Sequence, residues 1–165
     1  HVTGIINTGI AGSLRNEVNV GDIVLATDAV QHDVDAAGFG YQPGEIPQMG
    51  IKEFPADDHL REVAVSCCRR ANPDIQTFCG RVASGDQFIN SREKKNWIRD
   101  TFDAYCTEME GAAIAQAAYL NQVPYLIVRA ISDKADDSAN VDYSEFEAKA
   151  VEHSVRLMAA MLEEL

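Results

Sequence analysis

Three charged side chains in the last third of the sequence have the types and spacing of a chemical site: Glu110, Arg129 and Asp133. Arg129 interrupts an apolar run at residues 124–131, which predicts a strand covered on both faces. An unpaired buried charge is costly, so we expect a carboxylate from residues 108–110 beside it. Asp133 follows the run, at the strand end where open α/β sheets bind ligands. A functional role for Asp133 and a purely structural one are equally supported by these residues alone.

Two glutamates separated by one residue, Glu108 and Glu110, precede an Ala-rich helix predicted at residues 111–120. Residues at i and i+2 do not share a helix face, whereas on an extended segment they point the same way. The pair therefore predicts either two converging carboxylates or charges that favour the positive end of the helix. The second, structural interpretation is the more common one.

Small or polar residues follow predicted strands at four places, where ligand-binding groups could converge. These segments are residues 8–12, 84–90, 108–110 and 129–133. The first segment is neither a dinucleotide fingerprint nor a Walker loop, so it predicts no phosphate site. A Gly- and Pro-rich loop at residues 38–55 holds Phe39 and Tyr41, which we expect to line a pocket or an interface, or else to anchor the loop.

Strand-like and helix-like patterns alternate along the chain, which predicts an α/β fold with a mostly parallel central sheet flanked by helices. We expect one domain over residues 1–165. Strands are predicted at residues 2–7, 23–30, 75–83 and 124–131, and helices at about 58–71, 91–102, 111–120 and 142–165. The last helix carries an apolar stripe that we expect to dock on the sheet, formed by Ala148, Val151, Val155, Met158, Leu162 and Leu165.

The net charge of −12 argues against nucleic acid or an anionic membrane as partner, because both bind through clustered Lys and Arg. No apolar run is long enough to span a bilayer. The four cysteines have no metal or redox spacing, which predicts reduced core residues of a cytoplasmic protein. The sequence starts at His1 and enters a strand almost at once, so we expect that an N-terminal part of the protein precedes it.

Five blocks of the sequence together resemble the 5′-methylthioadenosine/S-adenosylhomocysteine nucleosidases of the purine nucleoside phosphorylase superfamily. They are NTGIAG, HDVDAAGFGY, SGDQFIN, EMEGAAIA and VRAISDKAD, and the resemblance covers essentially the whole chain. It implies a nucleoside phosphorylase-like fold and hydrolysis of the N-glycosidic bond of an adenine thionucleoside, which releases adenine and a thioribose product. It also implies a homodimer that needs no metal and no organic cofactor.

The resemblance assigns catalytic roles to three residues. Asp133 supplies a proton to purine N7, Glu110 binds the ribose hydroxyls and helps hold the attacking water, and Arg129 lies near Glu110 and that water. Adenine is a poor anionic leaving group, and a general acid typically contributes about 10²–10⁴-fold to such a step. Burial must raise the pKa of an aspartate that plays this part.

The resemblance also implies substrate contacts. Met109 packs against the sugar, and the segment at Phe88 and Ile89 stacks on the base and binds its edge. Phe39, Tyr41 and Pro47 reach the alkylthio group of the ligand in the neighbouring subunit. The other expected contacts are Ile10, Ala11, Gly12, Glu108, Ser132, Ala135 and Tyr143.

Two departures from the family pattern affect this prediction. The carboxylate that activates water in the family lies in an N-terminal region that this sequence lacks, so the chain alone is expected to be incomplete for catalysis. Ile10 replaces a hydroxyl found in some relatives, which favours water over phosphate as the nucleophile. The alternatives are a phosphorolytic or futalosine-type enzyme of the same superfamily and a non-catalytic domain that binds adenine nucleosides.

Overall fold

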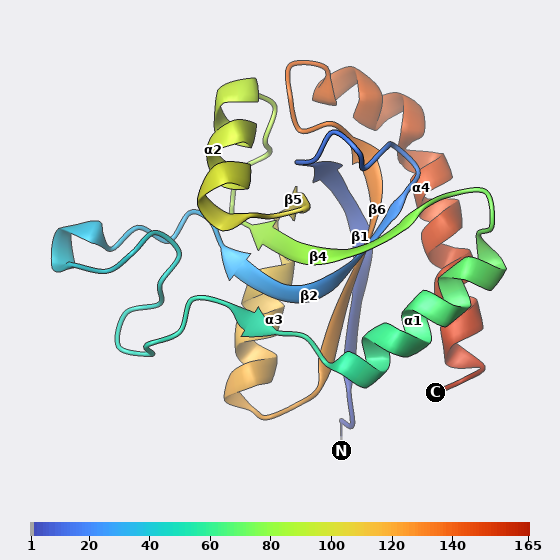
Figure 1. The fold of residues 1–165 in the computed structure, drawn as a ribbon, viewed down its shortest axis with the longest axis horizontal. Coiled ribbons are helices and arrows are strands. Elements are labelled where there is room, and N and C mark those ends of the chain that lie inside the picture. The colour runs from blue at the N-terminus through green and yellow to red at the C-terminus, as the bar shows by residue number, and fades with distance from the viewer. Residues whose placement is uncertain (1) are drawn as a thin grey trace.

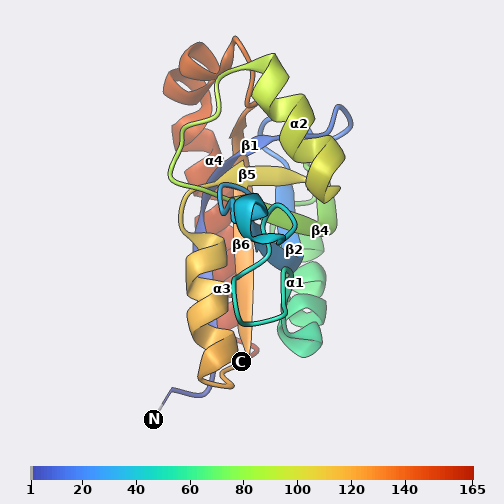
Figure 2. The same ribbon diagram turned by 90° about the vertical axis from the view of Figure 1, so that its left-hand side faces the viewer.

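The computed structural model describes residues 2–165, except for the side chains of residues 140–145, and it has an α/β fold (Figure 1). The elements follow one another as β1 (Ile5–Ser13), β2 (Ile23–Gln31), the 3₁₀ helix η1 (Ala37–Phe39), β3 (Phe54–Pro55), α1 (Asp58–Ala71), β4 (Thr77–Ser84), α2 (Arg92–Phe102), β5 (Cys106–Glu108), α3 (Gly111–Leu120), β6 (Tyr125–Asp133) and α4 (Ala139–Leu162). Figure 2 shows the strands in the middle, with α3 on one side and α1 on the other. None of the helices in the described part of the chain combines the length and apolarity needed to cross a bilayer.

The sheet is mixed and closed, so the prediction of a mostly parallel sheet was wrong. Its order is β3-β2-β4-β5-β1-β6, and a further pairing of β2 with β6 closes five of the strands into a ring. Parallel pairs are β1–β6, β2–β4 and β4–β5, whereas β1–β5, β2–β3 and β2–β6 are antiparallel. An apolar run indicates that a strand is buried on both faces, but it carries no information about the direction of the neighbouring strands.

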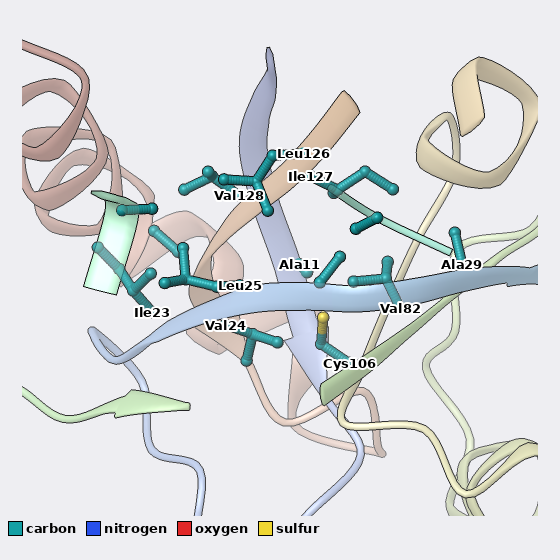
Figure 3. Close-up of a cluster of buried hydrophobic side chains, with 14 of the residues drawn as sticks. Ala11, Ile23, Val24, Leu25, Ala29, Val82, Cys106, Leu126, Ile127 and Val128 are labelled. Atoms are coloured by element: carbon teal, nitrogen blue, oxygen red, sulfur yellow. The ribbon is translucent and has the colours of Figure 1, made fainter. Parts of the chain in front are cut away.

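The main core packs on both faces of the ring strands (Figure 3), because it includes consecutive strand residues, which point to opposite faces, and residues of α1, α3 and α4. The labelled side chains come from all five ring strands: Ala11 from β1, Ile23 and Leu25 from β2, Val82 from β4, Cys106 from β5 and Leu126 to Val128 from β6. All nine residues of β6 are buried, which agrees with the strand predicted there. The four cysteines are unpaired; three are buried as predicted, and Cys79 is exposed.

Local capping explains where two of the helices begin. The Asp57 side chain accepts a hydrogen bond from the Leu60 amide at 2.9 Å, and the Ser91 side chain accepts one from the Lys94 amide at 3.4 Å. Such caps satisfy amides that have no partner within the helix. The predicted starts of α1 and α2 are confirmed.

The last helix begins at Ala139, earlier than predicted, and docks through a different face from the predicted stripe. Val155 is 61% exposed and Leu162 is 71% exposed. Ala148, Val151 and Leu165 are also exposed, and Met158 is partly buried. The residues that face the body of the protein are Ala150, His153, Ser154, Leu157 and Met161. Three of them are small or polar, so hydrophobic periodicity gave this face too little weight.

Candidate active site

One cavity lies where β1, β5 and β6 end beside the turn that follows β4. Its volume of ≈ 450 Å³ is within the range of small-molecule sites. It is lined by Ile10, Ala11, Gly12, Phe88, Thr107, Glu108, Met109, Glu110, Ser132 and Asp133. Nine of these ten residues were predicted from the sequence, and Thr107 was not.

Two hydrogen bonds hold the buried Asp133 side chain at the end of β6. It is 2% exposed; its Oδ1 accepts a hydrogen bond from the Ala135 amide at 2.7 Å, and its Oδ2 accepts one from the Ser132 hydroxyl at 2.8 Å. A Cβ atom at Gly12 would lie 2.7 Å from Asp133 Oδ1, so only glycine allows β1 to pass this carboxylate. β1 continues through Gly12, beyond the strand end predicted at residue 7, and the glycine serves the close approach.

The partner of Arg129 is Glu108. The Arg129 Nε donates to Glu108 Oε2 at 3.0 Å, and Nη2 donates to the same oxygen. The remaining guanidinium N–H groups donate to the carbonyls of Asn7 and Val128 and to the Asn7 side chain. These bonds occupy all five donors of the guanidinium.

Arg129 is therefore committed to protein groups, and it does not line the cavity. Its predicted role near Glu110 and the attacking water stays a prediction; its hydrogen bonds in the structure hold Glu108. The sequence showed that residues 108–110 contain its partner, but it could not show which glutamate the strand would direct inward.

The two glutamates have different surroundings. Both oxygens of Glu108 accept a hydrogen bond from the Gly111 amide, at 3.0 and 2.9 Å, and the Ser84 hydroxyl donates to Oε1. Ser84 in turn accepts from the Ala112 amide at 2.7 Å. Glu108 and Ser84 thus satisfy the first amides of α3, where negative charge is favoured. The Glu110 side chain is exposed to the cavity, and no described residue forms a hydrogen bond or ion pair with its carboxylate.

The other predicted contacts fall into three groups. Ile89 lines a smaller recess of ≈ 30 Å³ beside the main cavity, and Ala135 packs behind Gly12. Phe39, Tyr41 and Pro47 lie in the loop between β2 and β3, which projects from the body (cyan, Figure 1) and does not reach this cavity. The side chain of Tyr143 lies outside the described residues.

A buried histidine supports the turn that carries Phe88. His32 is 1% exposed, and a Cβ at Gly85 would lie 2.4 Å from its Cε1 atom. The next residue, Asp33, accepts a hydrogen bond from the Asp86 amide at 2.7 Å. Burial lowers the pKa of His32, with Lys94 acting in the same direction and Asp33 opposing it, which favours the neutral ring. Through these contacts the HDVD block positions the SGDQFIN block.

Comparison with known proteins identifies the family. Residues 1–164 match the family model of the phosphorylase superfamily. The 5′-methylthioadenosine/S-adenosylhomocysteine nucleosidase of Anoxybacillus flavithermus is 41% identical over 162 residues, which cover 98% of this chain and 69% of that protein. The chain belongs to this nucleosidase family of the phosphorylase superfamily. The family predicted from its sequence blocks is confirmed.

Solved structures extend the comparison to the nucleosidase fold. The nucleosidase of Neisseria meningitidis in complex with methylthio-immucillin-A is 36% identical, with a TM-score of 0.92 over 99% of this chain and 70% of that one. The futalosine hydrolase of Helicobacter pylori is 34% identical, with a TM-score of 0.93 over 99% of this chain and 69% of that one. The nucleoside phosphorylase-like fold is thereby confirmed.

Proposed function

We propose that this protein hydrolyses the N-glycosidic bond of 5′-methylthioadenosine and S-adenosylhomocysteine. The observation that carries the proposal is that Asp133, Glu110 and Phe88 line one cavity of suitable size. They supply a carboxyl group, a second carboxylate and an aromatic ring, which a nucleoside needs for its base and its sugar. Relatives of this chain, including the one from Anoxybacillus flavithermus, are named for these two substrates.

In the proposed reaction the bond between the sugar and N9 of adenine breaks. Asp133 gives a proton to N7, so that adenine leaves as a neutral base. Positive charge develops on the sugar, which a nearby carboxylate stabilises, and Glu110 is the carboxylate exposed to the cavity. Water adds to the anomeric carbon and releases a proton to solvent, and Asp133 takes up a proton from solvent before the next turnover. Met109 packs against the sugar, and Phe88 stacks on the base.

Arg129 and Glu108 act in this scheme without touching the reacting atoms. Their ion pair fixes the end of β5, and the bonds from Glu108 to Gly111 fix the start of α3. Glu110 lies between these two anchored points. The pair therefore orients the carboxylate that holds the ribose and the water.

The proposal includes a homodimer. Phe39 is 89% exposed, and the loop that carries it, with Tyr41 and Pro47, extends away from its own cavity. A large exposed aromatic side chain on a projecting loop suits a protein interface. The family resemblance directs these three side chains to the ligand of the partner subunit.

The test is release of the free purine base from methylthioadenosine, S-adenosylhomocysteine and futalosine, each with and without phosphate. Methylthioadenosine and S-adenosylhomocysteine should release adenine at rates that do not depend on phosphate. A requirement for phosphate would establish phosphorolysis instead. Turnover of futalosine alone would favour the function of the Helicobacter pylori hydrolase. Binding of methylthioadenosine without turnover would indicate a binding domain.

A further inference from the structure

The hydroxyl group of Thr107 is buried against the cavity and has no hydrogen-bond partner. Thr107 is 5% exposed, and its Oγ1 is one of the few buried side-chain atoms without a partner in the described part of the chain. Its neighbours in β5 have other partners: Cys106 packs in the core, and Glu108 bonds to Arg129. A buried hydroxyl without a partner lowers stability, so its presence requires an explanation.

The small recess beside the main cavity shows which residues surround Thr107. The recess is lined by Gly12, Gln87, Phe88, Ile89, Thr107, Glu108, Met109 and Asp133. It contains the three residues assigned to the base under the proposed function, Phe88, Ile89 and Asp133. Glu110, which is assigned to the ribose, lines only the main cavity. Met109, which is assigned to the sugar, also lines the recess, so the recess lies where base and sugar meet, and Thr107 is beside the residues assigned to the base.

The strand register gives the same position independently of the cavity. Thr107 of β5 pairs with Gly12 of β1, and Gly12 pairs with Asp133 of β6. The three residues form one row across adjacent strands. Because Gly12 has no side chain, nothing from β1 rises between Thr107 and Asp133.

We propose that the Thr107 hydroxyl hydrogen-bonds to the purine base and helps determine which bases the site accepts. This inference rests on the proposed function and adds a contact with the base that the proposed function does not include. A hydroxyl group both donates and accepts, so it can pair with a ring nitrogen or with an amino group of the base. A site built to hydrogen-bond a ligand discriminates against analogues that lack the matching group.

The experiment compares Thr107→Val, Thr107→Ser and wild type in calorimetric binding of free adenine and of methylthio-immucillin-A. Valine keeps the branched shape and removes the hydroxyl, whereas serine keeps the hydroxyl. Thr77→Val is the matched control, because Thr77 lies at the start of β4, whereas the cavity lies beside the turn that follows the end of β4. We expect Thr107→Val to weaken both ligands about tenfold, the size of one net hydrogen bond, and Thr107→Ser to weaken them less than threefold. The melting temperature of free Thr107→Val should not fall, because the hydroxyl has no partner in the free protein.

Three results would overturn the inference. They are unchanged binding by Thr107→Val, a loss confined to the ligand that carries a sugar-like ring, and an equal loss in the serine variant. In each case wild type still binds, so the proposed function survives. If wild type binds neither ligand, the proposed function fails, and this inference fails with it.

Discussion

Glu108 and Arg129 form an ion pair that is almost completely removed from water, with side-chain exposures of 3% and 2%. The pair joins β5 to β6 across the ring and reaches the first turn of α3 through the Gly111 amide. One interaction thus connects two strands and a helix directly behind the cavity.

Breaking this pair should destabilise the protein strongly. Glu108→Gln and Arg129→Met each leave a buried charge without its counterion, for which we expect a loss of about 3–5 kcal/mol in the free energy of unfolding. The double variant Glu108→Leu/Arg129→Met leaves no unpaired charge and should lose less than the two single changes together. Urea denaturation measures all three. A single-variant loss below about 1 kcal/mol would show that the pair is not needed for stability.

Asp133→Asn tests the proton donor. Asparagine keeps the shape: its oxygen can accept the bond from the Ala135 amide, and its NH2 group can donate to the Ser132 hydroxyl, but it cannot give a proton to N7. The kcat for methylthioadenosine should fall at least about a hundredfold, with a much smaller change in binding. The exposed Asp137→Asn is the control. A substrate whose leaving group needs no protonation should recover most of the rate; equal impairment on both substrates would reduce Asp133 to a positioning role.

Phe39→Ala tests the proposed dimer. The ring is exposed in the single chain, so its removal should change the free energy of unfolding by no more than about 0.5 kcal/mol. In a dimer it would be an aromatic anchor, and its loss should weaken association by about tenfold or more. Sedimentation at several concentrations measures this, with the solvent-exposed Tyr119→Ala as the aromatic control. Identical sedimentation of the variant and wild type would exclude this loop from the interface.

His32 should make stability depend on pH. Because burial lowers its pKa in the folded state, the unfolded state binds the proton more readily. This contribution to stability is complete above the ordinary histidine pKa of about 6.5 and is lost as pH falls below it. His32→Leu should therefore reduce the fall in unfolding free energy between pH 7 and about pH 5. His59 is exposed, so His59→Asn should keep the wild-type dependence of unfolding free energy on pH. If His32→Leu also keeps it, His32 is not the source of that dependence.

Two leucines on α4 test which face of the helix docks. Leu157→Ala removes a completely buried side chain and should cost about 2–5 kcal/mol. Leu162→Ala makes the same chemical change at a position that is 71% exposed and should stay within about 0.5 kcal/mol. Thermal and urea unfolding compare the two. A greater loss at Leu162 would restore the stripe predicted from periodicity.

Features that depend on local chemistry could be predicted from the sequence. Asp57 and Ser91 determine helix starts through their own side chains, and Asp133 follows an apolar run that had to be buried. Features that depend on distant parts of the chain could not be predicted. The direction of β2 relative to β6, the rotation of α4 and the choice of Glu108 over Glu110 are all decided by tertiary packing. Thr107 was missed because an unpartnered hydroxyl is visible only when its neighbours are placed.

The closed ring has a consequence for how the chain folds. Ring closure requires β6 to pair with β1, as in Ile5 with Tyr125, and with β2, as in Ile23 with Ala130. These partners come from opposite ends of the sequence, so the entropy of closing very long loops must be overcome before the ring interior is sealed. Helices α1 and α2, with their local caps, can form early, whereas the site floor built from β1, β5 and β6 exists only after both ends of the chain have met. The cavity is therefore expected to be among the last parts of the protein to form.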